Sequence, residues 1–235
     1  MIEDVRFTDE RWLQFWQNYK GLDHQKQAVL KLAKHIRQAD ARLLSESADW
    51  VSDYKAPQQA AVIRNPLTVR FQSQLDNKSG TGYRECFSSS CAMLAMYWGK
   101  VVNDDAYNVI RARYGDSTSP QAQLSALRSL GLKADFHTDG TPLALESEIN
   151  AGRPVAVGWL HHGPVAAASG SGHWSVVIGH TSGAWIFNDP NGEADLVNGG
   201  YTRNTKGGGV VYSRKNWNPR WMPGGTGGWY LTCQP

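Results

Sequence analysis

Long apolar runs are missing from this chain of 235 residues. No stretch approaches the roughly 18 consecutive apolar residues of a membrane-spanning helix, so we expect no integral membrane segment. Residues 1–4 also lack the basic and apolar regions of a secretory signal. We therefore expect the protein to be made in the cytoplasm, with any export following another route.

Cysteine is scarce, with only Cys86, Cys91 and Cys233 in the whole chain. Three cysteines do not make a disulfide framework, and Cys86 and Cys91 do not have the CxxC spacing of a structural zinc site. The sequence thus predicts free thiols, one of them a candidate reactive group. We expect neither a metal nor a cofactor.

Acidic residues are absent after Asp195, although the formal net charge of the chain is only +3. The basic and tryptophan residues of this tail are Arg203, Lys206, Arg214, Lys215, Arg220, Trp217, Trp221 and Trp229. One interpretation is a basic, aromatic surface that meets an anionic polymer. The other is an ordinary solvated face with tryptophans in the core. We expect no nucleic-acid partner.

The pattern of residues 1–56 predicts a small helical module, separable from a main domain at residues 57–235. Thr8 and Asp9 offer an N-cap to a helix on which Trp12, Phe15 and Trp16 share one face. Docking, scaffolding and substrate binding are the roles that we consider for this module.

The main domain mixes helical and extended segments, which predicts an α+β fold. Helices are expected from Cys86 onward and at residues 104–114, 120–130 and 143–150. Strands are expected at residues 133–137, 154–160, 173–179, 184–189, 210–212 and 229–232.

Cys86 stands at the start of a strongly helical apolar run. The N-terminal end of a helix stabilises a thiolate, which is the reactive form of the side chain. Ser88, Ser89 and Ser90 follow and are expected to cap the start of the helix. Cys91 is the alternative nucleophile, but it lies five positions further along and is flanked by apolar residues.

His173 and Asp189 lie at the two ends of a predicted β-hairpin. With the turn centred near Thr181, they are opposite each other, and Cβ atoms about 5 Å apart permit a hydrogen bond. In one alternative, Asp189 merely starts a turn. In another, the register slips by one residue and turns His173 away, which leaves His161 or His162 as the base.

These residue types suit a thiol hydrolase. Cys86 would attack a carbonyl carbon, His173 would carry the proton to the leaving amine, and Asp189 would orient the imidazole. Gln74 would donate a side-chain N–H to the oxyanion, beside the backbone N–H of Cys86.

Three further residues are candidate substrate contacts: His161, His162 and Trp174. The two adjacent histidines follow a predicted strand, where they are either loop surface or substrate-binding. A metal site formed with His173 is an alternative, but no paired carboxylate motif supports it.

The motifs together resemble those of the papain-like peptidases that process bacteriocin leader peptides, and of their free-standing relatives. The resemblance rests on Gln74 twelve residues before Cys86, on Ala92-Met93 within the helix, on Gly172-His173-Trp174 and on Asn188-Asp189-Pro190. It covers roughly residues 69–230. It implies a papain-like fold, with Cys86 on the central helix, His173 and Asp189 on the antiparallel sheet, and Gln74 as the oxyanion residue.

The sequence departs from that family at Phe87 and Ser88, where glycine and proline are usual. No transporter domain follows, so we expect a free-standing enzyme. We expect a cysteine peptidase or amidase that cleaves the peptide part of peptidoglycan and is released to the cell wall or carried by a virion. The alternatives are a protease that processes a protein, leader or virion precursor, and an inactive interaction module on the same fold.

Overall fold

The computed structural model describes residues 65–235. The helical module predicted for residues 1–56, and its boundary with the main domain, lie outside the described residues and stay predictions. Among the described residues, no helix is both long enough and apolar enough to cross a membrane.

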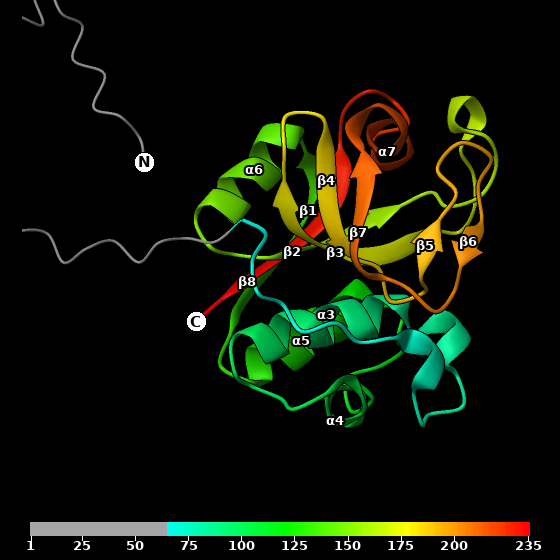
Figure 1. The fold of residues 1–235 in the computed structure, drawn as a ribbon. Coiled ribbons are helices and arrows are strands. Elements are labelled where there is room, and N and C mark those ends of the chain that lie inside the picture. Colours follow the sequence, from blue (N-terminus) through cyan, green and yellow to red (C-terminus); the bar gives the residue numbers. More distant parts are fainter. Residues whose placement is uncertain (1–64) are drawn as a thin grey trace, which may run out of the picture. The chain divides into compact units, whose positions relative to one another are not determined.

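A six-stranded antiparallel sheet forms the centre of the fold, in the order β1-β8-β2-β3-β4-β7 (Figure 1). Its strands are β1 (Lys133–Gly140), β2 (Val155–Trp159), β3 (His173–His180), β4 (Ala184–Asn188), β7 (Gly208–Ser213) and β8 (Gly228–Gln234). A second, two-stranded sheet pairs β5 (Glu193–Ala194) with β6 (Tyr201–Arg203). The α+β fold class predicted from the sequence is confirmed.

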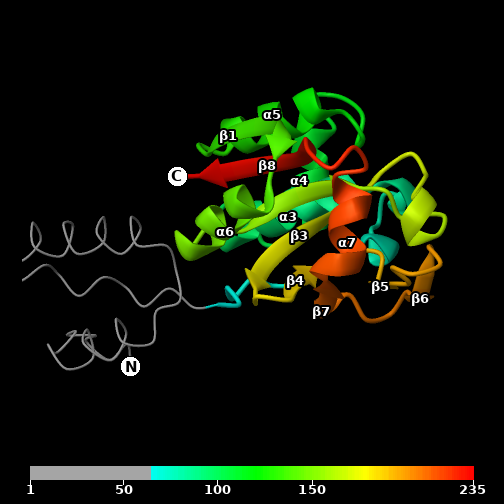
Figure 2. The ribbon, with the colours of Figure 1, turned by 90° about the horizontal axis from the view of Figure 1, so that it is seen from above.

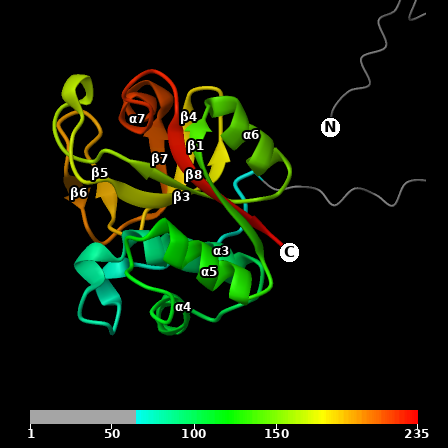
Figure 3. The same cartoon turned by 180° about the vertical axis from the view of Figure 1, so that it is seen from behind.

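Helices cover both faces of the central sheet (Figures 1 and 3). One face carries α3 (Cys86–Tyr97), α4 (Asp104–Arg111) and α5 (Pro120–Ser129). The other carries α6 (Pro142–Asn150) and α7 (Arg214–Trp221). Seen from above, α3 runs beneath β3, which brings the start of the helix toward the end of the sheet where β5 and β6 lie (Figure 2).

Helix α3 is the central element because it is buried on almost every side. Nine consecutive residues, from Phe87 to Ala95, are buried. A helix that is buried all round needs neighbours on all sides, and the sheet, α4 and α5 supply them. The expectation that Ser88, Ser89 and Ser90 cap the helix is wrong, since the helix already begins at Cys86 and all three serines are buried.

The basic, aromatic tail is core only in part, since Arg203, Lys206 and Lys215 are exposed. It forms β6, β7, β8 and α7, a helix that the sequence did not indicate. Trp217 and Trp221 are buried, and of the three tail tryptophans only Trp229 stays exposed. The interpretation of the tail as a basic surface is therefore wrong for its central part, where the tryptophans belong to the core.

Arg220 is the most deeply placed cation of this tail, with a fully buried side chain. Its guanidinium donates to the backbone carbonyls of Leu160, His162, Gly163 and Leu196, at 2.7 to 3.2 Å. These four carbonyls belong to two loops beside the sheet, so one side chain joins the loops together.

We expect Arg220→Met to lower the free energy of unfolding by about 2–4 kcal/mol, because four buried carbonyls lose their donor. Urea denaturation at neutral pH measures the change. Arg203→Met, at an exposed position of β6, is the matched control and should change stability little. Equal losses of stability in the two variants would show that Arg220 does not hold the two loops together.

Candidate active site

Cys86 is the first residue of α3 and is partly exposed. Its position at the N-terminus of the helix places the thiol where the helix dipole favours a negative charge. Cys91, the alternative nucleophile, is fully buried, and burial raises the pKa of its thiol well above the ordinary value. A buried, protonated thiol is a poor nucleophile, so the environment favours Cys86.

His173 and Asp189 make a direct hydrogen bond, with 2.7 Å between Nε2 and Oδ1. Both side chains are buried. Asp189 also accepts from the hydroxyl of Tyr212 at 3.0 Å and from the backbone N–H of Asn191 at 3.1 Å. These bonds fix the carboxylate and leave Nδ1 of His173 as the ring nitrogen free for chemistry.

The charge state of His173 follows from its neighbours. Burial lowers the pKa of the imidazole, but the Asp189 carboxylate and the Cys86 thiol more than offset this and raise the pKa to about 10. The ring is thus an imidazolium at neutral pH, and Cys86 is one of the groups that hold its charge. An imidazolium beside a cysteine stabilises the thiolate.

The register of the hairpin differs from the prediction by two residues. Val176 pairs with Asn188 rather than with Ile186, and a bulge follows between Val177 and Gly179. The expectation that His173 lies directly opposite Asp189 is therefore wrong. A shift of two residues keeps each side chain on its expected face, so the two groups meet on a diagonal instead.

Gln74 is buried and opens a short 3-10 turn, Gln74–Asp76. Its Nε2 donates to the carbonyl of Gly82 at 2.9 Å, and this carbonyl also accepts from the N–H of Glu85 at 3.1 Å. The amide of Gln74 is in this way joined to the residue that precedes Cys86. A primary amide has two N–H groups, so one remains for a ligand.

The rings of His161 and His162 are tilted against each other, and His161 lies beside His173. The ring centroid of His161 lies 3.9 Å from that of His162 and 5.5 Å from that of His173. Burial, followed by the positive charges nearby, lowers the pKa of His161 to about 3, so this ring is neutral. His162 is exposed. Among residues 65–235, no group of three His, Cys, Asp or Glu side chains is arranged to hold a metal ion.

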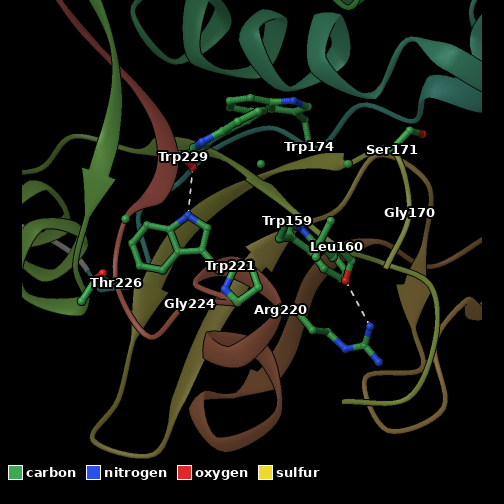
Figure 4. A pocket seen from close by; sticks show the side chains of 14 residues that line it. Trp159, Leu160, Gly170, Ser171, Trp174, Arg220, Trp221, Gly224, Thr226 and Trp229 are labelled. Atoms are coloured by element: carbon green, nitrogen blue, oxygen red, sulfur yellow. Dashed lines mark hydrogen bonds between the residues drawn. The ribbon is translucent and has the colours of Figure 1, made fainter. Parts of the chain in front are cut away.

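Trp174 lies in the wall of a pocket of about 340 Å³ (Figure 4). Its ring stacks on Phe87, with centroids 3.6 Å apart. The pocket begins beside the catalytic candidate His173, because its lining includes both chain neighbours, Gly172 and Trp174. The other lining residues are Gly158, Trp159, Leu160, Gly170, Ser171, Arg220, Trp221, Pro223, Gly224, Thr226, Gly227 and Trp229.

Two residues that hold the site together were not among those singled out from the sequence. Tyr212 reaches Asp189 because β7 pairs with β4, and Tyr201 packs edge-on against His173, with centroids 5.6 Å apart. Neither stands in a local motif, since Tyr212 depends on the pairing of β4 with β7 and Tyr201 reaches His173 from the separate two-stranded sheet.

A helix that opens with a cysteine, packed on an antiparallel sheet that carries a buried histidine–aspartate pair, is the arrangement of the papain-like cysteine peptidases. The chain belongs to this class: the sequence profile of the family described as papain-like cysteine protease AvrRpt2 matches residues 63–198. The resemblance found in the sequence motifs is thereby confirmed, and the protein is a member of a cysteine peptidase family.

One solved structure agrees with this fold, and two others are similar to the chain more loosely. A C39-like peptidase from Bacillus anthracis superposes with a TM-score of 0.51 at 16% identity, over 73% of this chain and 98% of that one. A double-glycine-motif protease of an AMS/PCAT transporter, solved with its leader peptide, gives a TM-score of 0.48 at 20% identity, over 73% and 95% of the two chains. The peptidase domain of Streptococcus ComA gives 0.47 at 16%, over 71% and 98%. No curated protein sequence matches the chain.

The raised pKa of His173 predicts how stability depends on pH. A histidine whose pKa rises from 6.5 to about 10 on folding stabilises the folded state fully below pH 6.5. This contribution declines as the pH rises and is lost above pH 10. In Asp189→Asn the main source of the raised pKa is gone. We therefore expect the stability difference between the native protein and this variant to be largest just below pH 6.5 and to shrink toward pH 10.

Chemical denaturation at several pH values measures this difference. Asp195→Asn is the control, because Asp195 is a carboxylate outside the site that is held by its own loop. A difference that stays constant, or grows as the pH rises, would contradict a buried imidazolium.

Proposed function

We propose that Cys86, His173, Asp189 and Gln74 are the catalytic residues of this cysteine peptidase, and that its substrate is a peptide or protein segment. The observation that carries the proposal is the buried His173–Asp189 hydrogen bond, together with the raised pKa to which Cys86 contributes. A free cysteine, a charged imidazole and an orienting carboxylate are the three parts of a thiol nucleophile.

The geometry supports a two-step mechanism. The Cys86 thiolate attacks the carbonyl carbon of the scissile amide, and the resulting oxyanion accepts hydrogen bonds from the backbone N–H of Cys86 and the free N–H of Gln74. His173 then gives its proton to the leaving amine, and a thioester remains on Cys86. A water molecule, deprotonated by His173, attacks the thioester and releases the acid product.

The tryptophan-lined pocket supports a preference for a bulky apolar side chain near the cleaved bond. A volume of about 340 Å³ is at the lower end of ligand pockets and holds one large side chain. Trp174, Trp221 and Trp229 surround it in Figure 4. His161 and His162, on the neighbouring loop, are proposed to contact the polar backbone of the same substrate.

Peptidoglycan is the weaker substrate candidate. The sequence arguments for it were the resemblance to a bacterial hydrolase, the small-residue loops around the site and the basic, aromatic tail. The last of these is weakened because Trp217, Trp221 and Arg220 are buried. The family and the apolar pocket instead favour the alternative, a protease that acts on a protein. Release of stem peptides from purified sacculi must therefore be measured separately from cleavage of peptides.

The nucleophile assignment is tested by two cysteine variants of the full chain. Cys86→Ala should abolish cleavage of a proteome-derived peptide library, followed by mass spectrometry. Cys91→Ala should keep most of the activity and cost only packing stability. Full activity in Cys86→Ala would overturn the assignment, and cleavage of sacculi without cleavage of the library would make peptidoglycan the substrate.

The pocket is tested by Trp229→Ala. Trp229 lines the pocket with its side chain 55% exposed, so removal should cost little stability. We expect kcat/KM to fall about tenfold or more for library peptides with a bulky apolar residue, and less for peptides without one. Val211→Ala, an exposed apolar residue of β7 outside the pocket, is the matched control. Equal effects on both peptide classes would rule out the pocket as a specificity site.

A further inference from the structure

Glu85 is a buried carboxylate directly before Cys86, with 1% of its surface exposed. It accepts hydrogen bonds from three side chains of the loop formed by residues 77–81. Its Oε2 accepts from Asn77 and Ser79, both at 2.7 Å, and its Oε1 accepts from Thr81 at 2.9 Å. A single carboxylate thus fixes three of the five residues of this loop.

Helix α4 holds the same carboxylate from the other side. Asn108 donates to it at 3.4 Å, and Arg111 forms a buried ion pair with it at 3.6 Å. Arg111 also donates to Ser88 in the first turn of α3, at 3.1 Å. The arginine offsets the negative charge of Glu85, which would otherwise repel a thiolate one residue away.

The loop continues into Gly82, which presses against Gln74. A Cβ atom on Gly82 would lie 2.1 Å from the backbone oxygen of Gln74, so a residue with a side chain does not fit at this contact without a shift of the backbone. The Gly82 carbonyl accepts from the side chain of Gln74 and from the N–H of Glu85. The shape of the loop therefore sets where the Gln74 amide lies.

We propose that Glu85 is a positioning residue for the oxyanion site: it fixes the loop of residues 77–82, and through Gly82 it aims the free N–H of Gln74. The proposal rests on the catalytic roles proposed for Cys86 and Gln74. A carboxylate suits this task because it only accepts hydrogen bonds and offers about four acceptor positions. The amide of a glutamine would present an NH2 group to donors that already point inward.

The test is a double-mutant cycle on the full chain with a peptide substrate found in the library. We expect Glu85→Gln to lower kcat about 10- to 100-fold with KM nearly unchanged, because an oxyanion donor acts in the transition state. Gln74→Ala should lower kcat about 10²–10³-fold. In the Gln74→Ala background, Glu85→Gln should cause less than a threefold further loss, since the group that it positions is already absent.

The rate of Cys86 alkylation by iodoacetamide separates positioning from general damage. It should not fall below the native rate in Glu85→Gln, because alkylation does not need an oxyanion donor and loss of the Glu85 charge leaves Arg111 to favour the thiolate. Glu148→Gln is the matched control, a glutamate paired with Arg153 at 2.6 Å on α6, and it should keep full kcat.

Independent, multiplicative losses in the double variant, or alkylation that falls in step with kcat, would overturn the proposal. If Glu85→Gln does not fold, Thr81→Val replaces it, because it removes one of the three loop hydrogen bonds. It should give a smaller loss of kcat that also disappears in the Gln74→Ala background. Activity in Cys86→Ala would instead overturn the proposed function itself. Failure of the proposed function is therefore distinguishable from failure of the positioning role of Glu85.

Discussion

The buried hydrogen bond between His173 and Asp189 is the constraint on which the structure of the site depends. Removing an imidazolium and a carboxylate from water costs several kcal/mol per ion unless each finds partners. The sheet supplies these partners: β3 carries His173, the end of β4 leads to Asp189, and β7 brings Tyr212 to the second carboxylate oxygen. The order of strands β3, β4 and β7 in the sheet therefore places His173, Asp189 and Tyr212 close together.

A second buried charge pair, Glu85 with Arg111, stands on the helical side of the site. The sheet holds the proposed base and the helices hold the proposed nucleophile, so the proposed reaction requires both layers to meet with little freedom. Helix α3 achieves this because it is buried on nearly all sides, which leaves its N-terminus no alternative position. Gln74 is tied to both layers, since its backbone N–H donates to Pro190, next to Asp189, and its side chain to Gly82.

The sequence indicated the fold class and brought together Cys86, His173 and Asp189 because each lies at the end of a strongly patterned segment. It missed the register of the hairpin, since periodicity does not reveal a bulge between Val177 and Gly179. The predicted register was wrong by an even number of residues, so His173 and Asp189 were still assigned to the correct face of the sheet. Tyr212 could not be found in this way, because it reaches Asp189 from a strand distant in sequence. Glu85 was missed because periodicity does not show that the irregular loop of residues 77–81 folds back onto its carboxylate.

The tail after Asp195 shows why composition alone is a poor guide to substrate. Arg220 and Trp217 look like parts of a basic, aromatic surface, yet one binds backbone carbonyls and the other packs in the core. A guanidinium has five N–H donors, which suits it to join loops as well as to bind anions. The same tail contributes Trp221 and Trp229 to the pocket beside His173. In the proposed function the tail thus acts on the substrate through the shape of that pocket, and charge attraction at a distance is not needed to explain the tryptophans.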